Sequence, residues 1–325
     1  MRLLIASLIF VAVSVSALAA GPPAAMTKSE FDALLQRISN WGRWGSDDEL
    51  GTLNLITPAK RAAAAALVRD GVTVSLALNL NKVKDEVNYK PFEHQITTTN
   101  MPGFQGAGDR YSIEYHGFAH SHMDGLPHMA HKGSFYNGVP FSAVKPSGSE
   151  RLGIHNAGIN GVFTRGVLVD MPRHLGLKFL EPGTAISVAD IENWEAANKV
   201  KIASGDVLLI RTGRWAKVAT DGQWNFMEKA AGSHASLAAL LKERDVAALG
   251  SDGISDVMPS GVEGLFNPLH ELVLVGLGMP LFDNLDLELL AEVAAQKQRA
   301  TFLFVAAPLR VPGGTGSPLN PLAVF

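Results

Sequence analysis

The chain has 325 residues, of which 47% are hydrophobic and 18% charged, and it contains no cysteine. This composition is typical of a globular protein with a sizeable core, and the lack of thiols excludes disulfides, iron–sulfur clusters and cysteine nucleophiles. The formal net charge of −3 excludes a protein that binds nucleic acid through a basic surface. The low content of charged residues indicates a compact body with buried subunit contacts.

The first residues have the pattern of a secretory leader. Arg2 supplies a positive charge, residues 3–13 are apolar, and Ala17-Leu18-Ala19 matches a small-x-small cleavage site. We expect residues 1–19 to be a signal peptide and residues 20–325 to form the mature domain. Because no other segment approaches the length of a membrane span, we expect an exported, membrane-free protein, periplasmic in a Gram-negative cell.

The first third of the mature chain predicts helices, loops and one strand. In chain order these are a helix over 27–39, an ordered loop over 41–54, a helix over 57–69, a strand over 72–78 and an irregular polar insertion over 81–109. Thr27 with Glu30 forms a capping-box pattern, and Pro58 suits the first position of a helix.

The second half of the chain alternates between strand and helix patterns. It predicts a strand over 166–171, a helix over 187–199, a strand over 207–212, a helix over 226–243, a strand over 246–250, an apolar run over 273–279, a helix over 286–297 and a strand over 301–306. No repeat or linker interrupts this alternation. We therefore expect one mixed α/β domain.

Histidines are concentrated in one short segment. Ten occur in the chain, and five of them lie between residues 116 and 131: His116, His120, His122, His128 and His131. A window of this length would hold about half a histidine by chance. Such enrichment indicates a functional cluster.

The arrangement of these histidines predicts a metal site. A strand pattern begins at Tyr111, and if the strand continues, its period of two places five side chains on one face: His116, Phe118, His120, His122 and Asp124. His120, His122 and Asp124 then form a three-point site for Zn²⁺ or Mn²⁺. His116 shares the face and is a further possible ligand, whereas Phe118 is a candidate substrate contact.

Residues 125–127 break this strand and bring His128 back toward the ligands. A histidine at that position suits the general base for a metal-bound water. Zinc lowers the pKa of its bound water from about 15.7 to about 7, which no arrangement of uncharged side chains achieves. The sequence thus predicts hydrolysis by a metal-activated water with His128 as the base.

The segment from His120 to His128 resembles the signature of the cyclase family of metal-dependent hydrolases, which includes bacterial kynurenine formamidases and isatin hydrolases. The family motif runs His-x-Gly-Thr-His-x-Asp-x-Pro-x-His, and His122, Asp124 and His128 stand at its offsets. Other stretches that resemble the family lie at residues 44–54, 205–213, 268–270 and 282–285.

The resemblance implies a swivelling β/β/α-type fold, a homodimer or homotetramer, and hydrolysis of an amide-type bond in a small molecule, such as a formamide, a lactam or a related cyclic amide or ester. It implies that His122 and Asp124 bind the metal and that His128 transfers protons. His270 matches a late histidine that completes a second metal position or contacts substrate. Asp283 stands where formamidases use a glutamate to bind a second metal.

The sequence departs from the family pattern at several positions, and two of these departures concern the metal ligands. Phe118 occupies the place of the first histidine, so His120 is expected to supply the missing imidazole, with His116 as the other candidate. Asp283 is one methylene shorter than glutamate, which favours one metal ion over two. Two alternative functions remain. The family name is compatible with a lyase or cyclase reaction on a small polar substrate, and the histidine cluster is compatible with a non-catalytic periplasmic metal-binding protein.

Overall fold

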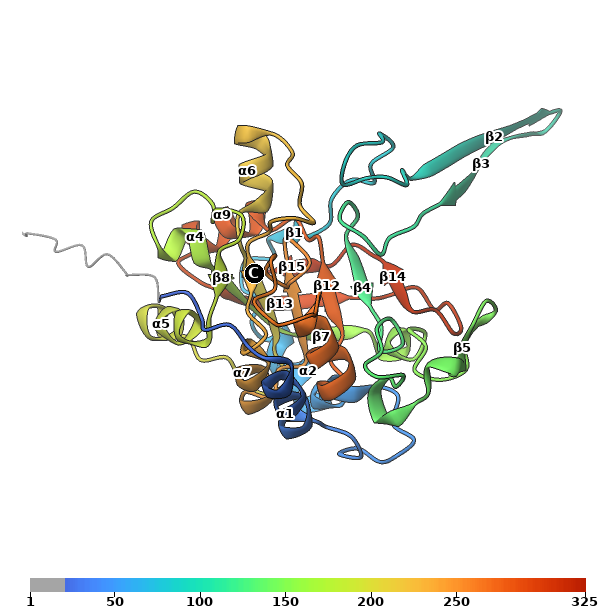
Figure 1. Ribbon diagram of the computed structural model, residues 1–325. Coiled ribbons are helices and arrows are strands. Elements are labelled where there is room, and N and C mark those ends of the chain that lie inside the picture. Colours follow the sequence, from blue (N-terminus) through green and yellow to red (C-terminus); the bar gives the residue numbers. More distant parts are fainter. Residues whose placement is uncertain (1–20) are drawn as a thin grey trace, which may run out of the picture.

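The computed structural model describes residues 21–325 (Figure 1), so the predicted signal peptide lies outside the described residues. Within this range a nine-stranded mixed sheet runs through the molecule in the order β1-β15-β13-β7-β9-β11-β12-β4-β14. The strands are β1 Thr73–Ser75, β4 His122–Asp124, β7 Val162–Asp170, β9 Val207–Arg211, β11 Ala248–Ser251, β12 Leu281–Asp283, β13 Thr301–Ala306, β14 Gly316–Pro318 and β15 Leu322–Val324. Strands β7, β9, β11 and β12 are parallel, and the outer pairs are antiparallel.

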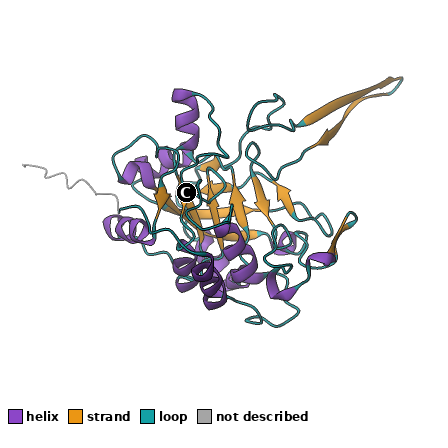
Figure 2. Ribbon diagram, viewed as in Figure 1, coloured by secondary structure: helices purple, strands orange, loops and turns teal. Residues whose placement is uncertain are grey.

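Helices surround the sheet, and the two-stranded ribbon over residues 93–112 projects from the body of the molecule (Figure 2). The described residues form three such two-stranded ribbons in all, separate from the large sheet. The helices are α1 Lys28–Ile38, α2 Pro58–Ala65, α3 Ala157–Asn160, α4 Met171–His174, α5 Val188–Asn198, α6 Arg214–Asp221, α7 Leu237–Glu243, α8 Pro268–His270 and α9 Glu288–Gln296, with a π-helix over Glu271–Leu277 and 3₁₀ turns η1 Gly51–Leu55, η2 Tyr136–Gly138 and η3 Phe141–Ala143. The ribbons are β2 Glu93–Met101 with β3 Phe104–Ser112, β5 Val144–Lys145 with β6 Gly148–Ser149, and β8 Ala185–Ile186 with β10 Gly232–Ser233.

The two faces of the sheet carry separate hydrophobic cores. In β7, Val167 and Val169 pack into one core, whereas Leu168 packs into the other, as the period of two in a strand requires. Residues of α1, α5, α7 and the π-helix belong to the first core, and residues of α9 belong to the second. The expected mixed α/β domain with a large mixed sheet is confirmed.

Helices that begin with a capping box and strands that consist of an apolar run form as predicted. Helix α1 begins with the capping box, in which the Glu30 N–H donates to Thr27 Oγ1 and the Thr27 N–H donates to Glu30 Oε2. Ser187 and Asp190 form the same arrangement at the start of α5. The apolar runs at 166–171, 207–212, 246–250 and 301–306 correspond to β7, β9, β11 and β13.

Three predictions of local structure were wrong. The insertion over 81–109 is irregular only at its start, because residues 93–112 form the β2–β3 ribbon. Its strands bury neither face, so they lack the apolar alternation that predicts a strand. The helix predicted over 226–243 is reduced to α7, since residues 232–233 pair with β8 instead. The strand expected from 111 to 124 is broken: β3 ends at Ser112 and β4 begins at His122.

The remaining apolar run, over 273–279, lies mostly in the buried π-helix. Helix α2 ends at Ala65, before the predicted end near residue 69. Across the described part of the chain, no helix combines the length and hydrophobicity needed to traverse a lipid bilayer.

Candidate metal centre

Strand β4 and its neighbour β12 place three polar side chains on the same face of the sheet. Met123, in the middle of β4, packs into the core together with Phe282, its partner in β12. The alternation of side chains then turns His122 and Asp124 to the opposite face, and Asp283 lies directly beside His122 in the register. All three side chains are buried.

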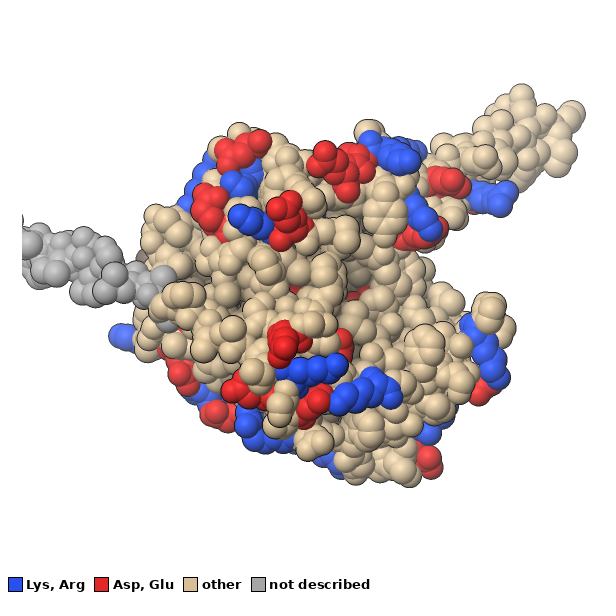
Figure 3. Space-filling model, viewed as in Figure 1, with Lys and Arg blue, Asp and Glu red and all other residues tan. Residues whose placement is uncertain are grey.

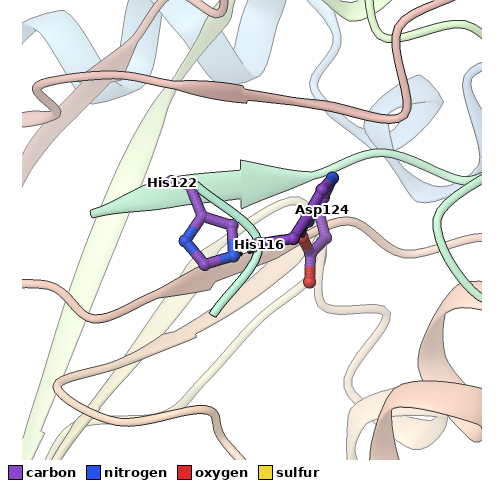
Figure 4. A group of neighbouring side chains, drawn as sticks. All are labelled: His116, His122 and Asp124. Carbon is purple, nitrogen blue, oxygen red and sulfur yellow. Dashed lines mark ion pairs between the residues drawn. The ribbon is translucent and has the colours of Figure 1, made fainter. Parts of the chain in front are cut away.

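His116 approaches these residues from the loop that precedes β4. Its Nδ1 lies 2.8 Å from Asp124 Oδ1, and its Nε2 lies 3.0 Å from Thr315 Oγ1. His122 Nε2 lies 3.3 Å from the same Asp124 oxygen. Figure 4 shows the three side chains of His116, His122 and Asp124 directed toward one another. Gly316 leaves room for this ring, because a Cβ there would stand 2.8 Å from His116 Cε1.

A second group of three side chains shares Asp124. His270 Nε2, from α8, lies 3.1 Å from Asp283 Oδ2 and 3.6 Å from Asp124 Oδ2. Its other ring nitrogen, Nδ1, lies 2.6 Å from Asp256 Oδ2. Burial lowers the pKa of His270, but the surrounding carboxylates Asp283, Asp124 and Asp256 outweigh burial and raise it well above its usual value.

The donor atoms of both groups fit a divalent cation. Each group places its candidate ligand atoms within 4.8 Å of one another. Within the described residues, both carboxylate oxygens of Asp124 and the Nδ1 of His116 are buried without a properly oriented hydrogen bond. Burial raises the pKa of Asp124, but the neighbouring imidazoles of His128, His122 and His116 hold it well below its usual value. An anionic carboxylate among imidazoles is a suitable donor set for Zn²⁺ or Mn²⁺.

His128 lies at the mouth of this cluster. Its ring stacks on that of His116, with centroids 3.8 Å apart and an interplanar angle of 7°. Its Nε2 is 3.8 Å from Asp124 Oδ2. Burial is the main cause that lowers the pKa of His128 to about 4, against the opposing charge of Asp124. The ring is therefore neutral at pH 7 and able to accept a proton.

His120 belongs to neither group, whereas the sequence pattern predicted it as a metal ligand. Because residues 113–121 form a loop, the period of two does not extend back from β4 to His120. The His120 carbonyl accepts hydrogen bonds from His122 Nδ1 and Asn284 Nδ2. Its ring is buried, and burial is the main cause that lowers the pKa of His120, whereas a contact with the Lys90 backbone opposes this shift.

A cavity of about 370 Å³ opens onto the cluster. Its walls include Tyr89, Phe118, Met227, Ile254 and Asn267 besides the candidate ligands and His128. The described residues that line it include no lysine or arginine. Figure 3 shows this face of the molecule hollowed near its centre, with acidic atoms visible in the depth. A neutral molecule with a planar apolar part suits such a cavity.

Sequence reasoning missed several residues of this site. Asp256 orients His270 through the contact with Nδ1, yet Asp256 lies in no motif that the sequence analysis recognised. The available signal was its position, because residues 252–256 follow β11 at the carboxyl end of parallel strands, where ligands bind in open α/β sheets. Tyr89 and Asn267 reach the cavity from loops distant in sequence, which no local pattern predicts.

Comparisons with known proteins agree with the family that the histidine motif resembles. The Cyclase family model, described as "Putative cyclase", matches residues 74–256. No curated protein matches the chain. The chain is similar to a crystal structure described as a novel cyclase, with 33% sequence identity, a TM-score of 0.80, and coverage of 90% of this chain and 99% of that chain.

Two isatin hydrolases share the fold at lower identity. Isatin hydrolase A from Ralstonia solanacearum is 19% identical, with a TM-score of 0.55 and coverage of 82% of this chain and 97% of that chain. An isatin hydrolase bound to the product analogue thioisatinate is 18% identical, with a TM-score of 0.54 and coverage of 80% and 94%.

The family match spans more than half of the chain and contains the whole group of His116, His122 and Asp124. The similarity to the solved cyclase structure covers 90% of this chain. The chain therefore belongs to the cyclase family.

Proposed function

We propose that this protein is a metal-dependent hydrolase that cleaves an amide-type bond in a small neutral molecule. The observation that carries the proposal is the convergence of His116, His122 and Asp124 on the wall of a cavity that His128 also lines. The fold shared with two proteins named isatin hydrolases supports hydrolysis of a cyclic amide or a related bond.

His116, His122 and Asp124 would hold the cation, Zn²⁺ or Mn²⁺. We propose one ion rather than two, because the two candidate groups share Asp124 and because Asp283 is one methylene shorter than the glutamate that formamidases use to bind a second metal. A bound divalent cation supplies Lewis-acid polarisation of a carbonyl and lowers the pKa of water.

The chain's own residues then orient the substrate and move the proton. His128 Nε2, neutral and at the edge of the cluster, accepts a proton from the attacking water and returns it to the leaving nitrogen. Phe118 and Tyr89 provide apolar walls for a planar substrate. The Asn267 side chain lines the same cavity, and its buried Oδ1 has no hydrogen-bond partner among the described residues, so it is available to the substrate amide.

The experiment that tests this function uses the mature chain, residues 20–325, loaded in turn with Zn²⁺ and with Mn²⁺. The metal-loaded protein is incubated with an aromatic formamide, a bicyclic lactam and a lactone, and the masses of the products are determined by mass spectrometry. We expect the products of the formamide or the lactam to gain the mass of one water. A product of unchanged or lower total mass would identify a lyase or cyclase instead, and a metal-loaded protein inert on all substrates would indicate a metal-binding role without catalysis.

We also propose that residues 1–19 direct export to the periplasm. Fractionation of a Gram-negative host that expresses the full chain tests this. We expect the shortened chain in the periplasmic fraction, and an unprocessed chain attached to the inner membrane when Ala17 and Ala19 are both replaced by bulky residues, because these replacements block cleavage and not export. Periplasmic protein of unprocessed mass, or cytoplasmic protein from the unaltered gene, would contradict the proposal.

A further inference from the structure

The loop over residues 113–121 joins β3 to β4 and brings His116 to the metal cavity. His116 and Phe118 both line that cavity. In the described part of the chain, no hydrogen bond between two backbone groups holds residues 115–120. The position of this loop must therefore be set by side chains that come from other elements.

Asn284 holds the loop through its side-chain amide. Its Nδ2 donates to the carbonyl of Gly117 over 2.7 Å and to the carbonyl of His120 over 3.2 Å. Asn284 is buried, follows the last residue of β12, and has a left-handed backbone with a φ of 54°. Asparagine adopts this conformation more readily than most residues other than glycine. Because Gly117 directly follows His116, the first of these hydrogen bonds acts on the backbone beside a candidate metal ligand.

Arg214, the first residue of α6, joins Asn284 to the same loop. Its Nη1 donates to Asn284 Oδ1 over 2.6 Å, and its Nη2 donates to the carbonyl of Phe118 over 2.7 Å. The guanidinium presents these donors in a rigid planar fork. Since Oδ1 of Asn284 accepts from Arg214, the Nδ2 of the same amide is left to face the loop. The two side chains together hold three carbonyls of the loop.

Arg214 is itself held in place. Its guanidinium carbon lies 3.8 Å from the ring centroid of Phe226 and 4.2 Å from that of Trp215. Its backbone N–H donates to the buried carboxylate of Asp252. The Nε of Arg214 is buried without a hydrogen-bond partner among the described residues. Burying a guanidinium with an unused donor costs free energy, so core stability alone does not explain this arginine.

We propose that Arg214 and Asn284 are positioning residues that keep the loop over residues 113–121 in the conformation in which His116 reaches the metal. Neither residue lines the metal cavity, so both act through the backbone of the loop. The sheet fixes the two ligands of β4, whereas the loop fixes the backbone of His116. The inference rests on the metal-dependent function proposed above, and it makes the metal affinity depend on two residues outside the ligand set.

Three substitutions test the positioning role. Asn284→Asp keeps the shape of the side chain, tolerates the left-handed backbone and still accepts from Arg214, but it has no N–H for the loop. Arg214→Met keeps an apolar stem against the rings and removes both donors. Asn40→Asp is the matched control: Asn40 is also buried, its Nδ2 donates to the carbonyl of Leu277, and its Oδ1 accepts from Arg43, outside the metal cavity.

Isothermal titration with Zn²⁺ measures the metal affinity of the folded mature chains. We expect Kd to rise by about 10-fold or more for Asn284→Asp and for Arg214→Met, because loss of a group that orients a ligand weakens binding to this extent. The added negative charge of Asn284→Asp would by itself strengthen cation binding, so weaker binding reports the loss of positioning. Asn40→Asp should bind zinc as the unaltered chain does. Unchanged affinity in Asn284→Asp or in Arg214→Met would overturn the proposal, as would an equal loss in Asn40→Asp.

Limited proteolysis of the metal-free chains tests the loop independently of the metal and of the reaction. Chymotrypsin cleaves after aromatic residues, and mass spectrometry of the fragments identifies cleavage after Phe118. We expect this cleavage to be about 10-fold faster in Asn284→Asp and in Arg214→Met than in the unaltered chain and in Asn40→Asp, because fewer hydrogen bonds oppose local opening. An unaltered chain that binds no zinc would contradict the proposed function, whereas equal cleavage rates in all of these chains would contradict the positioning role.

Discussion

His270 Nδ1 lies 2.6 Å from Asp256 Oδ2, and the same carboxylate accepts hydrogen bonds from the backbone N–H groups of Leu269 and His270. Asp256 thereby fixes both the start of the helical segment and the orientation of the imidazole ring. The opposite ring nitrogen is directed toward Asp124 and Asp283. A carboxylate behind a histidine in this way orients the ring and is usually as important to the site as its neighbours.

Asp256→Asn should lower kcat/KM of the metal-loaded protein by about 10- to 100-fold, because the amide cannot hold His270 beside Asp124, the carboxylate that would bind the ion. Steady-state kinetics on the best substrate of the panel gives the measurement. Asp286→Asn is the control, since Asp286 accepts from the Glu288 N–H at the start of α9, outside the metal cavity. Equal rates for Asp256→Asn and the unaltered chain would show that His270 needs no such orientation.

His128→Ala should keep the metal and lose turnover. The substitution removes the neutral imidazole that accepts the proton, and general-base catalysis of this kind contributes about 10²- to 10⁴-fold to the rate. Metal content by elemental analysis and kcat for the same preparation separate the two effects. An unchanged kcat would rule out His128 as the base, whereas loss of the metal would make His128 a ligand.

A matched pair of substitutions decides which imidazole completes the site. His116→Leu should abolish metal uptake, because His116 is one of the three residues whose candidate ligand atoms lie within 4.8 Å of one another. His120→Leu should retain one ion per chain, since the His120 ring lies outside both groups and an apolar side chain of similar size suits its buried position. Isothermal titration with Zn²⁺ and with Mn²⁺ measures both. The reverse result would restore the ligand set expected from the sequence.

The ion pair between Arg43 and Asp245 predicts a stability effect in acid. Two hydrogen bonds of 2.6 and 2.8 Å join the side chains, and the hydrogen bond from Arg43 lowers the pKa of Asp245. A depressed pKa in the folded state stabilises the protein above the unfolded pKa near 3.8, and this contribution is lost as the pH falls through the lower, folded value. Because both side chains are about one third exposed, the effect should be at most about 1 kcal/mol.

Urea unfolding of the unaltered chain and of Asp245→Asn tests this sign. Asparagine tolerates the left-handed backbone of residue 245, where φ is 51°, so the substitution changes mainly the charge. We expect Asp245→Asn to be less stable at pH 7 and the difference to shrink below pH 3.8. A difference that grows in acid would contradict the assignment.

The sequence predicted those parts of the molecule in which local chemistry decides the structure. The capping boxes at Thr27 and Ser187 mark the starts of α1 and α5 correctly, because the partners lie within one turn. The alternation around Met123 is likewise local, and it places His122 and Asp124 on one face.

Tertiary contacts decided the rest. His116 joins Asp124 because the chain bends after Ser112, and Ser121 helps to hold that bend through its hydroxyl, which donates to the carbonyl of Asn284 in a distant segment. The pattern of alternate residues pointed to His120 because it assumed an unbroken strand. The β2–β3 ribbon was not predicted for a different reason. Its strands bury neither face in this chain, so their sequences have no alternation of apolar and polar residues.

Metal content compared between the unaltered chain and Asp124→Ala is the most direct test of the central claim, because Asp124 belongs to both candidate groups. Both proteins are purified without chelator, analysed for bound metal, and assayed in the same preparations. We expect one zinc or manganese ion per unaltered chain with hydrolysis of the best amide substrate, and neither metal nor turnover for folded Asp124→Ala. Equal metal content in the two proteins, or hydrolysis that survives in the metal-free variant, would contradict the account.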